Sequence, residues 1–116
     1  MSRYDVIIIG AGPGGIFAAY ELAKKAPELK VAVFEAGNSL EKRKCPIDGK
    51  KIKSCINCKT CAIMSGFGGA GAFSDGKYNI TNDFGGTLYE YIGKDTAIDL
   101  MKYVDEINLA YGGEGT

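Results

Sequence analysis

The sequence contains no histidine and no tryptophan. Without histidine the chain cannot build a Ser-His-Asp triad, a histidine general base or a metal site with imidazole ligands. It also has no formal net charge, because 14 lysine and arginine residues balance 14 acidic residues. No overall electrostatic field therefore draws the chain to nucleic acid or to an anionic membrane. These absences remove several common classes of catalytic and binding site before any motif is considered.

Long hydrophobic runs are also missing. The apolar stretch near the N-terminus stops at Gly10, well short of the core of a signal peptide or a membrane span. We therefore expect a cytoplasmic protein with reduced thiols and no membrane partner. At 116 residues, of which 46% are apolar and 24% charged, the chain has the size and composition of one globular domain.

The first third of the chain has the pattern of a β-α-β unit. Residues 4–9 are a continuous run rich in β-branched side chains, typical of a strand buried on both faces. Pro13 opens a stretch with apolar residues at helical spacing, and Pro27 favours the end of that helix near Ala26. Residues 31–34 form the next buried strand. We therefore predict an α/β fold, a Rossmann-like unit of parallel strands joined by a helix.

A G-x-G-x-x-G sequence, residues 10–15, lies between the first predicted strand and the helix, and Glu35 ends the second strand. This is the spacing of a dinucleotide-binding fingerprint. Gly10 makes the tight turn, Gly12 lets a pyrophosphate approach the backbone, and Gly15 lets the helix pack close to the strand. The N–H groups that open the helix face the phosphates, and the Glu35 carboxylate accepts a hydrogen bond from a ribose hydroxyl.

The fingerprint leaves the identity of the dinucleotide open, because it fits FAD and NAD alike. A carboxylate at Glu35 repels the 2′-phosphate of NADP and argues against that cofactor. A glycine-rich turn that binds nothing is the remaining alternative. The strand, the helix and the acidic residue are all in register, which favours binding over that alternative.

Residues 42–61 form a basic, cysteine-rich insertion. The cysteines have the spacing C-x9-C-x2-C-x2-C, at Cys45, Cys55, Cys58 and Cys61. Four thiolates suit zinc or an iron–sulfur cluster, and the surrounding basic residues lower thiol pKa values. The spacing matches neither a zinc ribbon nor the bacterial ferredoxin run, so a redox-active dithiol and unliganded thiols stay open. Nucleic acid is not an expected partner, because residues 38–66 contain no aromatic residue on which a base could stack.

The rest of the chain is predicted with less regular structure. Residues 66–71 repeat G-x-G-x-x-G, but no strand precedes them and no helix follows, which argues against a phosphate-binding or kinase-type loop. Residues 78–81 form a candidate short strand. A helix is predicted from residue 95 or 96, with an apolar face that includes Ala97 and an end at residues 112–113.

Two strong strands are too few for a doubly wound sheet, and the first strand has a bare edge. We therefore expect residues 1–116 to be the N-terminal portion of an FAD-binding domain, with no complete second domain. The remainder of a parent chain, or another subunit, is the expected partner that covers the sheet edge.

Two blocks of sequence carry a resemblance to known proteins. Residues 6–20, with the Pro-Gly-Gly variant of the fingerprint, resemble the opening of FAD-dependent oxidoreductases. Cys45-Pro46, the three later cysteines and residues 65–77 together resemble a family of largely uncharacterised FAD-dependent dehydrogenases, also described as NAD(FAD)-utilizing oxidoreductases.

The resemblance implies that the chain holds the adenosine diphosphate half of FAD and that FAD carries out the redox chemistry of an oxidoreductase. It places Arg43 near the adenosine or pyrophosphate and residues 68–69 beside the flavin, and it names no acid, base or nucleophile. An NAD-binding sensor or regulatory module, whose cysteines hold a metal or switch by oxidation, is the alternative function. The expected cofactor-binding residues are Gly10, Gly12, Pro13, Gly14, Gly15, Glu35, Ala36, Arg43, Gly68 and Gly69.

Overall fold

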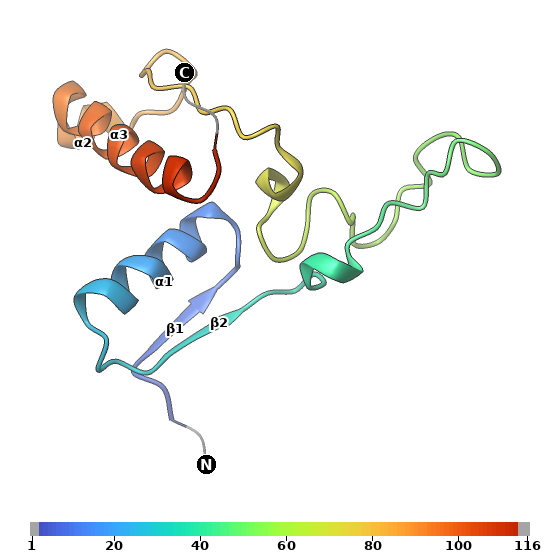
Figure 1. Ribbon diagram of the computed structural model, residues 1–116, viewed down its shortest axis with the longest axis horizontal. Helices are drawn as coiled ribbons and strands as arrows, with labels where there is room; N and C mark the ends of the chain where they lie inside the picture. Colours follow the sequence, from blue (N-terminus) through green and yellow to red (C-terminus); the bar gives the residue numbers. More distant parts are fainter. Residues whose placement is uncertain (1–2, 114–116) are drawn as a thin grey trace. The chain divides into compact units, whose positions relative to one another are not determined.

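The computed structural model describes residues 3–113 and divides into two compact units (Figure 1). The division falls between Phe73 and Ser74. The first unit contains the β-α-β element and both glycine-rich segments, and the second is helical. The chemistry expected from the sequence therefore falls within the first unit.

The β-α-β unit consists of β1 (Val6–Ile9), α1 (Pro13–Lys25) and β2 (Val31–Phe34). β1 and β2 pair in parallel, in a register that sets Val6 opposite Val31 and Ile9 opposite Phe34. α1 lies alongside this pair, as Figure 1 shows. The predicted α/β class is confirmed: the sheet has two parallel strands in the order β1-β2 and matches an incomplete Rossmann-like unit.

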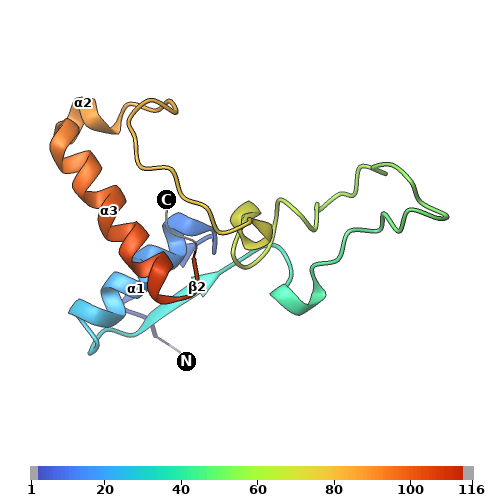
Figure 2. The same ribbon diagram turned by 45° about the horizontal axis from the view of Figure 1, so that its top comes forward.

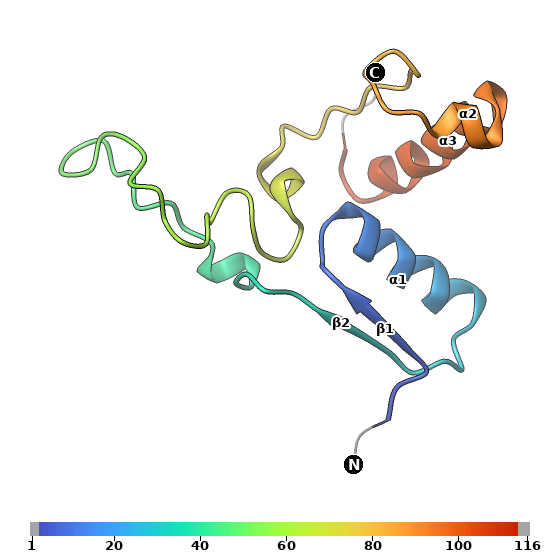
Figure 3. The same ribbon diagram turned by 180° about the vertical axis from the view of Figure 1, so that it is seen from behind.

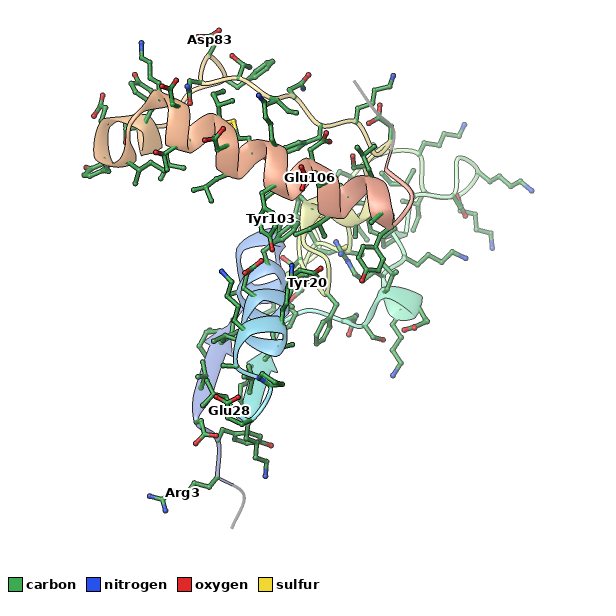
Figure 4. All side chains as sticks on the ribbon, turned by 60° about the vertical axis from the view of Figure 1, so that its left-hand side comes forward. Arg3, Tyr20, Glu28, Asp83, Tyr103 and Glu106 are labelled. Carbon is green, nitrogen blue, oxygen red and sulfur yellow. The ribbon has the colours of Figure 1, made fainter. Side chains whose placement is uncertain are left out.

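α1 begins and ends where the prolines predict. Pro13 occupies the first turn, where its missing N–H has no intrahelical partner to lose. Ala26 caps the other end through its N–H, which donates to the carbonyl of Leu22 at 2.8 Å. Two lysines in the last turn face the negative end of the helix dipole. Glu28 then lies in the turn that leads to β2, as Figure 4 shows.

The sheet is covered on one face only. Ile8 faces α1, since its Cγ2 atom lies 3.2 Å from the point where a side chain on Gly15 would begin. Ile7 and Ile9 point to the opposite face by the alternation of a strand, and they are 56% and 81% exposed. The prediction of strands buried on both faces is therefore wrong for the described residues, since Ile7 and Ile9 stay exposed on the second face.

After β2 the first unit continues with two short 3-10 helices, η1 (Leu40–Lys42) and η2 (Ala70–Phe73). The cysteine-rich segment between them extends away from β1 and β2 (Figure 3). Its local order comes from turns: Oδ1 of Asp48 accepts hydrogen bonds from the N–H groups of Lys50 and Ile52, at 2.8 and 3.0 Å.

The second unit contains α2 (Leu88–Ile92) and α3 (Lys94–Ala110), which follow one another through Gly93 (Figure 2). Ala97 on α3 is fully buried, as the predicted apolar face requires. Residues 78–81 have no strand assignment in the described part of the chain, although Lys77, directly before them, makes an isolated β-bridge. No helix among residues 3–113 is long and apolar enough to cross a membrane.

Candidate functional site

The first glycine segment makes a sharp turn at the carboxyl end of β1. Gly10 has a φ of 100°, which favours glycine, and its N–H donates to the carbonyl of Phe34 at 2.7 Å. A Cβ placed on Gly15 would overlap the carbonyl oxygen of Gly10. The turn and the close approach of α1 to β1 thus require glycine at both ends of the fingerprint, as its spacing predicts.

The middle of the same segment is open. Around Gly12 and Gly14, a Cβ would meet no atom within 4 Å, so packing within the described residues does not require glycine at either position. Gly12 is also the N-cap of α1, and no side chain caps the helix there. The first N–H groups of a helix have no intrahelical partner, and they carry the positive end of the helix dipole. An anion with a bulky substituent can therefore approach the backbone here.

Glu35 extends its carboxylate toward this segment from the end of β2. Its Oε1 accepts a hydrogen bond from the N–H of Ala11 at 3.0 Å, and its Oε2 accepts one from Gly37 at 2.8 Å. These two N–H groups, together with the charge of Arg43, hold the pKa of Glu35 below its ordinary value of 4.5. Each carboxylate oxygen keeps a second lone pair, so the ionised side chain can accept further hydrogen bonds from a sugar hydroxyl.

The second glycine segment, residues 66–69, lies directly beside the first. The N–H of Gly68 donates to the carbonyl of Ala11 at 2.8 Å. A Cβ on Gly69 would lie 3.1 Å from Cα of Gly12 and 3.2 Å from Cδ of Pro13. The backbone of this segment therefore forms a wall next to the open positions of the fingerprint.

Gly37 is a residue of this site that the sequence pattern did not reveal. A Cβ there would lie 2.5 Å from the N of Gly66 and 2.6 Å from its Cα. Glycine at position 37 is needed because the second glycine segment crosses over it. The N–H of Gly37 also holds Glu35, so one glycine serves both contacts. Ala36, between them, is exposed.

Arg43 lies between η1 and the second glycine segment, and its contacts are with the chain itself. Its side chain is 5% exposed, and its guanidinium donates four hydrogen bonds to main-chain carbonyls. Nε binds Ala62 at 2.9 Å and Nη2 binds Ile63 at 2.7 Å. Nη1 binds both Phe67 and Gly69 at 2.8 Å. Four of its five N–H donors are engaged in this way, all with carbonyls of residues 62–69.

The cysteines do not form a metal site in this structure. All four are free thiols; Cys45 is half-buried, and the three others are exposed. Among residues 3–113, no group of three or more Cys, Asp, Glu or His side chains is arranged to hold a metal ion. The predicted zinc or iron–sulfur ligand set of Cys45, Cys55, Cys58 and Cys61 therefore gains no support.

Cys61 nevertheless has a distinct environment. The N–H groups of Met64 and Ile63, in that order of effect, and the charge of Arg43 lower the pKa of its thiol. Hydrogen-bond donors of this kind favour the thiolate over the thiol.

The second unit holds a shallow pocket lined by residues of the loop before α2 and by the start of α3. Asp83 lies in that loop, and Figure 4 shows it there. Its Oδ2 accepts a hydrogen bond from the hydroxyl of Thr81 at 2.9 Å, and its N–H donates to the same hydroxyl at 3.1 Å. These contacts are local and stabilise the turn.

Comparisons with known proteins point to the same segment as the geometry. Residues 1–41 match the model of the Thi4 family. The thiamine thiazole synthase of Yarrowia lipolytica is 64% identical over 33 residues, which make up 28% of this chain and 10% of that protein. The corresponding enzyme of Phaeosphaeria nodorum gives the same identity and coverage.

An uncharacterized protein of Clostridium beijerinckii is 39% identical over 71 residues, which make up 61% of this chain and 13% of that protein. No solved structure matches. The chain thus spans about a tenth of the length of the relatives that it matches. The N-terminal segment, which carries β1, α1, β2 and Glu35, is similar to the Thi4 family.

Proposed function

We propose that this chain forms the cofactor-binding part of an FAD-dependent oxidoreductase and holds the adenosine diphosphate half of FAD. The observation that carries the proposal is the position of Glu35, whose carboxylate is hydrogen-bonded to the fingerprint segment through Ala11. Beside it lie two glycines, Gly12 and Gly14, that packing within the described residues does not require. A carboxylate next to an open, uncapped helix start fits a ribose joined to a diphosphate.

Each part of the site has a task in this proposal. The N–H groups in the first turn of α1 bind the diphosphate, and Gly12 and Gly14 leave it room. Glu35 accepts hydrogen bonds from the ribose hydroxyls through the lone pairs that Ala11 and Gly37 do not use. FAD, when bound, supplies hydride or electron transfer. The identification of the whole protein with the FAD-dependent dehydrogenases rests on the resemblance of its cysteine and second glycine blocks.

NAD is the second candidate ligand, because it shares the adenosine diphosphate half that these residues address. In that case the chain is a dinucleotide-binding sensor or regulatory module, and the cysteines are its redox or metal site. NADP fits neither proposal, since its 2′-phosphate would meet the carboxylate of Glu35. A cytoplasmic location stays a prediction.

The uncovered sheet supports a further part of the proposal. Ile9 is 81% exposed and Phe34 is 53% exposed. Apolar strand residues at an open sheet are normally covered by additional strands or a helix. We assign that cover to further sequence of the protein that contains this chain, or to another subunit.

Spectroscopy on the full protein that carries this chain tests the proposal. We expect a yellow protein whose flavin absorption is lost from the pellet and recovered in the supernatant after acid precipitation. Calorimetry with FAD and with NAD then separates the two ligands. A colourless protein that binds NAD but not FAD overturns the flavoprotein proposal in favour of the sensor, and binding of neither overturns both.

A further inference from the structure

Arg43 carries a charge that is buried in a shell of main-chain carbonyls. A buried charge is costly unless hydrogen bonds replace its hydration. Here the carbonyls of Ala62, Ile63, Phe67 and Gly69 supply them. The ring of Phe73 adds a cation–π contact, with its centroid 4.8 Å from Cζ of Arg43. One continuous stretch of the chain, residues 62–73, therefore offsets the cost of burying this side chain, through four carbonyls and the ring of Phe73.

The hydrogen bonds of Arg43 orient the peptide groups that reach the fingerprint. In a planar trans peptide the C=O and the N–H point in opposite directions. The peptide that joins Phe67 to Gly68 turns its carbonyl to Nη1 of Arg43 and its N–H to the carbonyl of Ala11, each at 2.8 Å. Arg43 thus holds one side of this peptide while Ala11, inside the fingerprint, holds the other.

Packing at Gly66 and Gly69, on either side of this peptide, also indicates that Arg43 holds the second glycine segment. A Cβ on Gly66 would lie 2.5 Å from Cδ of Arg43, so the arginine stem lies directly against that backbone. Gly69, whose carbonyl Arg43 binds, lies beside Gly12 and Pro13. Arg43 therefore contacts the second glycine segment on the side opposite to the fingerprint, and this contact keeps the segment against the fingerprint.

We propose that Arg43 is a positioning residue: it holds residues 66–69 as one wall of the dinucleotide site and does not itself bind the dinucleotide. This inference rests on the proposed function. It reverses the usual expectation for an arginine near a diphosphate, because the donors that could bind phosphate are directed to carbonyls. The planar fork, and not the charge alone, is the required feature.

The test is Arg43→Lys in the full protein, since lysine keeps the charge and loses the fork. We expect faster hydrogen exchange at the amide of Gly68 in the absence of ligand. We also expect FAD affinity to fall about tenfold, the size of a lost charge-assisted hydrogen bond. The salt dependence of FAD binding should stay as in the wild type, because no phosphate contact is removed. Lys44→Met replaces an exposed neighbouring cation and is the control; it should leave both the exchange at Gly68 and the FAD affinity as in the wild type.

Gly69→Ala provides a second variant that leaves Arg43 intact. It presses on Gly12 and Pro13 from the other side and should lower FAD affinity. In combination with Arg43→Lys the losses should be less than additive, because both variants move the same wall.

Three results overturn the inference while the wild type binds FAD. They are unchanged exchange at Gly68, unchanged FAD affinity in Arg43→Lys, and a weakened salt dependence that reveals a direct phosphate contact. A wild type that binds neither FAD nor NAD, with exchange at Gly68 accelerated in Arg43→Lys, contradicts the proposed function instead and leaves the hold of Arg43 on the segment intact.

Discussion

Two segments of this chain, residues 10–15 and residues 66–71, share the pattern G-x-G-x-x-G, but packing requires glycine at the third glycine of one and at the second glycine of the other. At the third glycine, a Cβ on Gly15 would overlap the backbone of Gly10, whereas one on Gly71 would meet nothing within 4 Å. At the second glycine the order reverses. A Cβ on Gly12 would meet nothing, whereas one on Gly68 would lie 2.8 Å from Cβ of Ala72.

The difference shows which glycines the fold requires and which glycines leave space for a ligand. In the first segment, the positive φ of Gly10 and packing at Gly15 account for the two ends, and the positions between them are open. In the second segment, packing accounts for residues 66, 68 and 69, against Arg43, Ala72 and the fingerprint respectively. The same sequence pattern therefore corresponds to the candidate binding site at residues 10–15 and to a wall beside that site at residues 66–71. The following variants test that division.

Gly15→Ala should have the largest effect. The added Cβ overlaps the carbonyl of Gly10, and that atom belongs to the turn itself and cannot rotate away. We expect a loss of about 3 kcal/mol or more in the free energy of unfolding, as for severe overpacking. Urea unfolding of the full protein measures this loss. Wild-type stability in this variant would contradict the close packing of α1 on β1.

Gly12→Ala and Gly68→Ala should separate binding from folding. Gly12→Ala has space, so its stability should change by about 1 kcal/mol at most, the scale of an N-cap substitution. Its FAD affinity should fall at least about tenfold, because the methyl group takes the place of the diphosphate. Gly68→Ala should instead lose about 2 kcal/mol of stability, because its φ of 91° is unfavourable for alanine and the methyl group meets Ala72.

Calorimetry and urea unfolding on both variants provide the comparison. A stable Gly12→Ala variant that binds FAD as the wild type does would mean that the open space is not the ligand site.

The β-α-β unit could be predicted because its determinants are local. The β-branched runs, Pro13, Pro27 and the spacing to Glu35 each act within a few residues, and the elements formed within two residues of the predicted bounds. α2 was not predicted, since five residues are too few to show a helical period. Residues 78–81 are a candidate strand by composition alone, and composition does not specify the pairing that a strand needs.

The site could be predicted in part, for the same reason. Glu35 and the fingerprint form a pattern with fixed spacing. The environment of Arg43 depends on carbonyls 19 to 26 residues away, which any residue type could supply. Glycine is needed at position 37 because the backbone crosses it at Gly66, and the residues next to Gly37 in the sequence do not indicate that crossing. Contacts made by the backbone of a distant loop do not depend on its residue types, so the sequence pattern does not predict them.

Glu35→Gln should have a smaller effect on binding and a clear effect on pH dependence. Glutamine removes the charge that ribose hydroxyls and the N–H of Ala11 favour, so FAD affinity should fall about tenfold. Because folding lowers the pKa of Glu35, its contribution to stability is complete above 4.5, the ordinary value, and is lost as pH falls through the lower folded value. The wild type should therefore lose more stability than the variant as pH falls below 4.5.

Glu28→Gln is the matched control, because Glu28 is exposed in the turn between α1 and β2 (Figure 4). It should leave both FAD affinity and the pH profile of stability as in the wild type. Equal pH profiles for the wild type and Glu35→Gln would show that the hydrogen bonds from Ala11 and Gly37 do not hold the carboxylate in solution.

Gly71→Ala should have the smallest effect, and it completes the comparison of the two segments. Gly71 is exposed, and a Cβ there meets nothing within 4 Å, so stability should change by less than about 0.5 kcal/mol. If the second segment is only a wall near Gly12, FAD affinity should also stay as in the wild type. A selective loss of FAD affinity, with stability unchanged, would mean that the cofactor extends along η2 to this position. The second segment would then contact the ligand at Gly71, and this residue would belong to the binding site as well as to the wall.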